Sequence, residues 1–196
     1  MAVPGVRALF GAASSPAWKG CLVSPFSKGI ETAEVTLRWD PSPADAPPHD
    51  LDLIAATYEG EAPYGPPTYL VHFDSRSPDG TITLTRESET GQGFGTDEAL
   101  KLELDRLAGS FTRVVVGIAV QQRHGRRPFG EISRPAVKIT EGYTALAEDD
   151  LSSVSDATAA TVAEFTRDDT GNWRFRKVVR GFDTDPEQFP SLMGDV

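Results

Sequence analysis

The segment SPDGTITLTRESETGQGFGTDE, from Ser77 to Glu98, has the residue types and spacing best suited to holding a hard cation. Its carboxylates are Glu87, Glu89, Asp97 and Glu98, and its bends come from Gly91, Gly93 and Gly95. Calcium takes about six to eight oxygen ligands, and closely spaced glycines let a loop direct several of them at one point. The segment makes calcium binding the first hypothesis, with a solvated surface turn as the alternative.

A second pair of carboxylates, Asp50 and Asp52, lies in the segment DLDLIAATY. Alternate side chains of a strand point to opposite faces, so the two aspartates share one side while Leu51 and Leu53 share the other. Like charges side by side are unfavourable without a counter-ion. A cation between them is one interpretation, and a polar strand start facing water is the other.

Two further aspartates, Asp74 and Asp79, follow the next expected strand and are second-rank metal candidates. The three histidines, His49, His72 and His124, lie in a proline-rich loop, a strand and a basic loop. No nucleophile or metal-ligand spacing connects them, so the sequence does not indicate an enzyme. Paired carboxylates can do acid and base chemistry, but this glycine-rich loop suits coordination better than a closed substrate pocket.

The composition favours a single all-β domain. The chain has 196 residues, 39% of them hydrophobic and 24% charged, which fits one soluble globular domain with a substantial core. Its 18 glycines and 15 prolines indicate many turns rather than long helices. We expect an antiparallel β-sandwich.

The charge balance and the single cysteine narrow the functional classes. A net charge of −10 repels phosphate backbones, so we expect no nucleic acid partner, and it attracts divalent cations. Cys21 is the only cysteine, which excludes an internal disulfide and a zinc site built on several thiolates, and it fits a reducing cytosol. We identify no signal peptide and no apolar run of the roughly twenty residues needed to cross a bilayer.

The expected organisation is an irregular N-terminal arm over residues 1–25, a sandwich over 26–182 and a short C-terminal tail over 183–196 that is either loose or pinned by Phe189 and Leu192. The arm, with Phe10 and Trp18, is either a flexible leader or a docking segment. We expect strands at 32–39, 50–58, 68–73, 81–85, 99–104, 113–120 and 135–140, and a hairpin over 162–179 with its turn at 168–172. The turn at 77–80 is expected to close a further hairpin that leads into the acidic loop.

Several motifs, taken in order, resemble the TerD family of bacterial tellurium-resistance and stress proteins. They are SPFSKG, Trp39-Asp40, the DLD at 50–52, the SPDG at 77–80, the acidic loop through Asp97-Glu98, GRRPFGEI at 125–132 and WRFRKVVRGF, and they span residues 22–181. The resemblance implies a calcium-binding β-sandwich somewhat like a C2 domain. It also implies a role in resistance to tellurite, phage and other stress, with cytoplasmic partners at the membrane.

The acidic loop departs from the family pattern, which reads close to GDNRTGEGDGDDE. Phe94 and Thr96 stand where the family has aspartates, Gln92 replaces a glutamate and Ser88 an asparagine. Fewer carboxylates weaken affinity for a divalent ion, so we expect one weak calcium site or none. Arg86 replaces a family glycine, and its charge can partly fill the role of a lost metal.

Two functions follow. The first is a noncatalytic, calcium-responsive module of a stress-resistance system in which carboxylates clamp a cation: Asp50, Asp52, Glu87, Asp97 and Glu98. The second is a structural or assembly subunit that has largely lost the metal and uses its arm, Phe94 and the basic loop 123–127 as contacts. In both, we expect protein partners and a cytoplasmic location, with peripheral contact at the inner face of the membrane as a further expectation.

Overall fold

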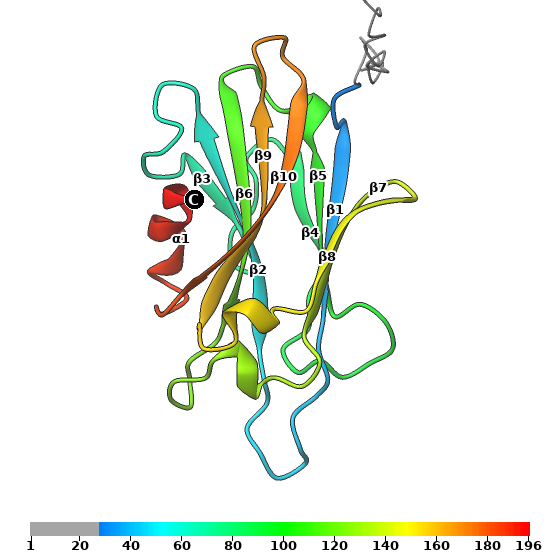
Figure 1. Ribbon diagram of the computed structural model, residues 1–196, viewed down its shortest axis with the longest axis vertical. Helices are drawn as coiled ribbons and strands as arrows, with labels where there is room; N and C mark the ends of the chain where they lie inside the picture. Colours follow the sequence, from blue (N-terminus) through cyan, green and yellow to red (C-terminus); the bar gives the residue numbers. More distant parts are fainter. Residues whose placement is uncertain (1–27) are drawn as a thin grey trace, which may run out of the picture.

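The structure, a computed structural model, describes residues 28–196 and is a sandwich of two β-sheets (Figure 1). The expectations for Phe10, Trp18 and Cys21 lie outside these residues. The strands are β1 Thr32–Arg38, β2 Leu51–Glu59, β3 Tyr69–Val71, β4 Ile82–Arg86, β5 Glu98–Glu103, β6 Phe111–Val120, β7 Ala136–Glu141, β8 Thr144–Asp149, β9 Ala159–Arg167 and β10 Trp173–Phe182. The all-β sandwich expected from composition is confirmed.

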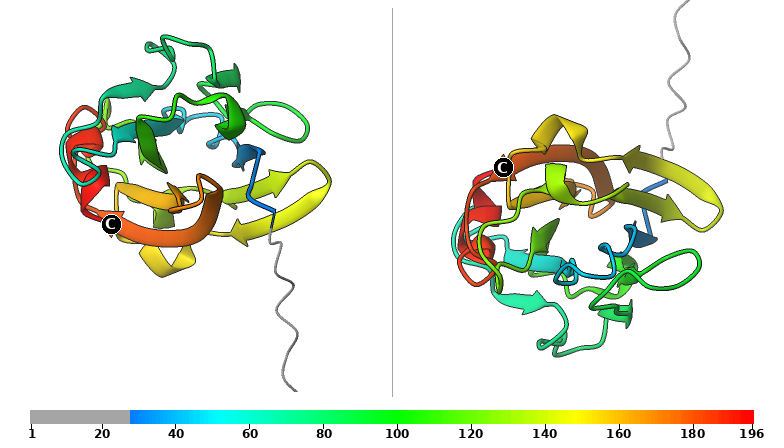
Figure 2. Two further views of the ribbon diagram at one scale, coloured as in Figure 1. Left: turned by 90° about the horizontal axis from the view of Figure 1, so that it is seen from above. Right: turned by 90° about the horizontal axis from the view of Figure 1, so that it is seen from below.

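Each sheet has five strands, and every neighbouring pair is antiparallel. The first sheet has the order β4-β5-β1-β7-β8, and the second has the order β10-β9-β6-β2-β3. The two layers face each other, and the β7–β8 hairpin projects to one side (Figure 2). Four single-turn 3₁₀ helices lie in the connections and at the C-terminal end: Leu104–Arg106, Phe129–Glu131, Ser152–Val154 and Met193–Asp195.

Hydrophobic periodicity explains which residues of each strand are buried. In β1, Val35 and Leu37 are buried in the space between the sheets while the intervening residues face outward, as the alternating pattern predicts. The continuous apolar run of β6 forms the middle strand of the second sheet and is buried on both faces. One face of it joins the main core, and the other is covered by the C-terminal segment.

That C-terminal segment is pinned to the second sheet, and Phe189 is one of the two residues expected to hold it. Helix α1, Phe189–Leu192, packs on the outer face of the second sheet, where Phe189 and Met193 are completely buried beside Ile54 and Tyr58 of β2 (Figure 1). A sheet with apolar side chains on both faces needs a further layer on its outer face, because those side chains would otherwise be exposed to solvent. The tail supplies that layer, so it belongs to the folded body.

The hairpin expected at Ser77–Gly80 was wrong, and one strand of the first sheet was not expected. The turn at Ser77–Gly80 does not close a hairpin, because β3 belongs to the second sheet and β4 to the first. This connection crosses between the sheets, and β4 pairs with β5 instead, across the acidic loop. Strand β8 was not expected, since TALAED has one β-branched residue, Thr144, and no aromatic residue. It is held by pairing with β7.

Candidate metal centre

Three predicted ligands are brought together at one end of the sandwich. Asp50 immediately precedes β2, Asp52 lies on β2, and Glu98 begins β5 on the opposing sheet; the loop that leads into β2 lies at the lower end in Figure 1. The Oε2 atom of Glu98 accepts a hydrogen bond of 2.6 Å from the N–H of Leu53, which joins the two sheets. The three residues are called the carboxylate cluster below.

Burial sets the electrostatics of this cluster. Asp50, Asp52 and Glu98 are 8%, 6% and 1% exposed. Burial, and then the charge of Asp52, raises the pKa of Asp50 to about 7. Burial also raises the pKa of Asp52, and it raises the pKa of Glu98 to about 9, opposed by the Leu53 hydrogen bond and assisted by both aspartates. The protein thus holds acidic groups where their charged forms are disfavoured.

One oxygen of the cluster is unpaired within residues 28–196. The Oε1 atom of Glu98 is buried and accepts no hydrogen bond from that part of the chain. A buried carboxylate oxygen without a donor is costly, and native proteins rarely keep one without a function. The charges of Asp50 and Asp52 act on Glu98, and carboxylate oxygens are the ligands that a hard cation such as calcium prefers. The residue types therefore fit a calcium ion, although the three side chains do not converge on one point among residues 28–196.

Residues after β6 supply the partners that the cluster does have. Arg123 Nη1 lies 3.4 Å from Asp50 Oδ2, and Gln121 Nε2 donates a hydrogen bond of 2.5 Å to Asp52 Oδ2. Antiparallel pairing of β2 with β6 explains their position, because Val120 lies opposite Leu51 and the chain continues past the aspartates. The sequence analysis missed both partners, although a prediction that these two strands pair would have indicated them.

The acidic loop lies beside the cluster without closing over it. Glu87 and Glu89 are exposed, and their charges contribute to the raised pKa values of Asp50 and Asp52. Asp97 is buried, but its Oδ2 atom accepts a hydrogen bond of 2.9 Å from the N–H of Trp39. Among residues 28–196, no group of three or more His, Cys, Asp or Glu side chains is placed to hold a metal ion directly.

The loop is anchored by a close approach to Trp39. Gly91 has a φ of +63°, and a Cβ atom there would lie 2.5 Å from the indole Nε1. That same Nε1 donates a hydrogen bond of 3.0 Å to the carbonyl of His49, next to Asp50. Only glycine combines this backbone conformation with this approach. Trp39 therefore connects the acidic loop to the strand that carries the aspartates.

The remaining predicted residues lie outside this arrangement. Asp79 Oδ1 accepts hydrogen bonds from Thr81 N, at 3.0 Å, and from the hydroxyls of Thr81 and Ser77, so it stabilises its own turn. Asp74 is exposed after β3. Arg86, expected to replace a lost metal, is exposed and makes no ion pair among the described residues, whereas Arg123 does.

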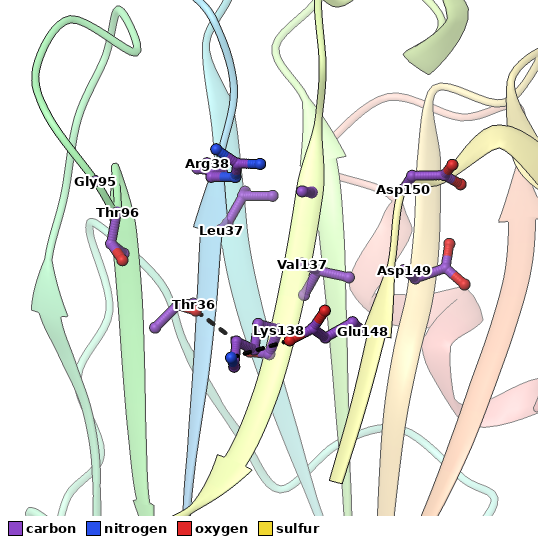
Figure 3. A pocket seen from close by; sticks show the side chains of 11 residues that line it. Thr36, Leu37, Arg38, Gly95, Thr96, Val137, Lys138, Glu148, Asp149 and Asp150 are labelled. Carbon is purple, nitrogen blue, oxygen red and sulfur yellow. Dashed lines mark hydrogen bonds and ion pairs between the residues drawn. The ribbon is translucent and has the colours of Figure 1, made fainter. Parts of the chain in front are cut away.

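A hollow on the outer face of the first sheet is a second candidate and differs in kind (Figure 3). It has a volume of about 650 Å³ and lies over β1, β7 and β8. Three of its charged residues are in ion pairs: Lys138 lies 2.9 Å from Glu148, and Asp149 lies 2.7 Å from Lys177. Paired charges at a surface of this kind need no ligand.

The fold and the cluster define a class of protein: an antiparallel β-sandwich with buried carboxylates at the loop end. The TerD domain profile matches residues 21–189, so the chain belongs to the TerD family. The resemblance noted in the sequence motifs is thereby confirmed. No helix among residues 28–196 is long and apolar enough to span a membrane.

Named relatives and solved structures agree with this assignment. The chain is 28% identical to tellurium resistance protein TerD of Alcaligenes sp. over 165 residues, which cover 82% of this chain and 85% of that protein. It is 24% identical to general stress protein 16U of Bacillus subtilis, covering 79% and 82%. The crystal structure of a TerD homologue from Streptomyces coelicolor A3(2) is 54% identical, with a TM-score of 0.83, and covers 85% of this chain and 98% of that one.

Proposed function

We propose that this protein is a noncatalytic, calcium-responsive module of a bacterial stress-resistance system that acts through protein partners. The observation that carries the proposal is the buried, unpaired Oε1 of Glu98 beside Asp50 and Asp52. Calcium would be held by these three residues, with Glu87, Asp97 and backbone carbonyls of the acidic loop as further oxygen donors. Tellurium resistance and general stress are the roles that the relatives' names record.

Binding would change the loop end in two ways. It would neutralise carboxylates that repel one another, and it would draw the acidic loop, which follows β4, toward the start of β2. A ligand that binds only the folded state stabilises it by about 2.7 kcal/mol at a concentration of 100 Kd. The resulting change in loop order and surface charge is what a partner protein would detect.

A calcium titration of the melting temperature and of the heat of binding tests this proposal. We expect millimolar calcium to raise the melting temperature by about 5–10 °C. Asp52→Asn should remove the increase, and Asp79→Asn should keep it, because Asp79 only stabilises its own turn. No shift for the unaltered protein at millimolar calcium would refute calcium binding.

The second candidate function is an assembly subunit whose metal site is lost. Two observations favour it: Phe94 is fully exposed in the acidic loop, and the described carboxylates do not converge on one point. An exposed phenyl ring at a loop tip suits a contact with another protein better than coordination. Light scattering of the full chain and of a chain lacking residues 1–25 tests this function. A smaller assembly after deletion, unaffected by calcium, would support it; equal sizes would contradict it.

A further inference from the structure

The carboxylate cluster already has a counter-ion supplied by the protein. Among residues 28–196, Arg123 is the one basic residue that forms an ion pair with the carboxylate cluster, through Asp50; the other ion pairs of a buried carboxylate involve Glu164. The guanidinium also opposes the raised pKa of Asp52, so its charge acts on both aspartates. Arg123 therefore performs, in part, the neutralisation that a bound cation would perform.

The Arg123 side chain is held far less tightly than that of Arg113, one of two arginines that pair with the buried Glu164; the second, Arg176, is 61% exposed. Arg113, on β6, is 2% exposed and 2.7 Å from Glu164, and it donates further hydrogen bonds to the carbonyls of Pro63, Gly194 and Val196. The Arg123 side chain is 59% exposed. Moving Arg113 would break a buried network, whereas moving Arg123 breaks one ion pair, with Asp50, and its guanidinium already lies largely in solvent.

The surroundings of Arg123 give it space to move. A cavity of about 700 Å³ is lined by Asp52, Gln121 and Arg123, together with His72 of the β3 end. Arg123 lines this cavity and its side chain is largely exposed, so the cavity gives the guanidinium room to turn and a small cation a route to Asp52.

We propose that Arg123 is a built-in competitor of the metal ion. In the metal-free protein its guanidinium pairs with Asp50, and a divalent cation must displace it, so Arg123 sets the calcium affinity of the site. This inference rests on the proposed function. It also accounts for the carboxylates' lack of convergence, because Asp50 is oriented toward Arg123 and Asp52 toward Gln121.

Calorimetric calcium titrations of four full-length proteins test the proposal: the unaltered chain, Arg123→Gln, Arg123→Lys and Arg126→Gln. Arg126 lies in the same loop but pairs with Asp183, so it is a matched control. We expect Arg123→Gln to bind calcium roughly three- to tenfold more tightly. Arg123→Lys keeps the positive charge and should stay near the unaltered affinity, as should Arg126→Gln.

The outcomes separate this inference from the function on which it rests. Equal or weaker binding by Arg123→Gln, with calcium binding by the unaltered chain, overturns the competitor role and leaves the calcium module intact. Binding by Arg123→Gln alone supports the competitor role and shows a site that the arginine has silenced. If all four proteins fail to bind calcium, both the function and the inference are refuted.

Discussion

Two acidic, glycine-containing regions lie at opposite ends of the sandwich and use their carboxylates in opposite ways (Figure 1). In the β9–β10 turn, Asp168 Oδ1 accepts hydrogen bonds from the N–H groups of Thr170 and Asn172, both at 3.0 Å, and Oδ2 accepts one of 2.7 Å from Arg174. These donors, with the Thr170 hydroxyl first, hold the pKa of Asp168 well below its usual range. The carboxylate cluster has the reverse character.

The difference shows which property distinguishes a candidate ligand site from a turn. Both regions combine acidic residues with a glycine at positive φ, so composition does not separate them. They differ in exposure to solvent and in the hydrogen-bond donors around each carboxylate. Asp168 is surrounded by donors, whereas Glu98 is buried with one oxygen unpaired. A carboxylate that already has its donors needs no ion, and one that lacks them gains from binding one.

The largest effect expected from this comparison is in the pH dependence of the metal-free protein. Glu98 has a folded-state pKa of about 9, above the value of 4.5 for an unperturbed glutamate. Its contribution to stability is therefore complete below about pH 4.5 and is lost as the pH rises through about 9. Asp50, with a pKa of about 7, loses its contribution in the same direction.

Urea denaturation in a calcium chelator at pH 6 and pH 9 measures this loss. We expect the unaltered protein to become less stable at the higher pH, and Glu98→Gln to be more stable than it there by about 3 kcal/mol. At pH 6 the difference should be smaller, because the folded glutamate is still protonated and only the unfolded chain has lost its proton; below about pH 4.5 the two proteins should be nearly equal. An identical pH dependence for both proteins would mean that Glu98 is not a strained carboxylate.

Two glycines, one in each region, give the next largest effect. Gly91 and Gly171 both have positive φ, but an added Cβ atom would meet Trp39 at Gly91 and nothing within 4 Å at Gly171. Both alanine substitutions carry backbone strain of about 1 kcal/mol. Gly91→Ala adds a clash with the indole, for a total of about 2–4 kcal/mol.

Denaturation midpoints of the two alanine variants give the comparison, with Gly171→Ala as the matched control for backbone strain. A larger loss at Gly91 would show that the acidic loop is anchored through Trp39, and the indole fluorescence should change with it. Equal losses would mean that the loop can move away from the indole, so that the anchor does not hold.

The strands that frame the site were predictable because their information is local. Alternation located β1, and the apolar run RVVVGIAV identified β6 as a central strand, since both patterns depend only on neighbouring residues. Strand β8 could not be found in this way, because TALAED acquires its structure from pairing with β7. The sheet exchange between β3 and β4 was equally hidden, as a turn sequence does not record which sheet each flanking strand joins.

The sequence named the carboxylates of the candidate site but not the residues that pair with them. Alternation along an extended segment predicted that Asp50 and Asp52 share one side of a strand, and the charges of both act on Glu98. Arg123 and Gln121 were missed because their position depends on the pairing of β2 with β6, which joins segments about seventy residues apart in the chain. Arg86 was proposed instead from its place in the loop, yet it lies exposed at the end of β4.

The smallest effect is expected for Asp168, whose carboxylate oxygens already accept hydrogen bonds. Asp168→Asn keeps an oxygen for the turn N–H groups but removes the charge that faces Arg174, so we expect only a small fall in melting temperature at pH 7. Because the pKa of Asp168 is lowered in the folded protein, its contribution is present above about pH 4 and is lost as the pH falls. The difference between variant and unaltered protein should therefore shrink in acid, opposite to the trend for Glu98→Gln. A difference that grows in acid would show that the Asp168 charge does not stabilise the turn. Calcium should leave the difference between variant and unaltered protein unchanged, because the donors to Asp168 come from its own turn and from β10.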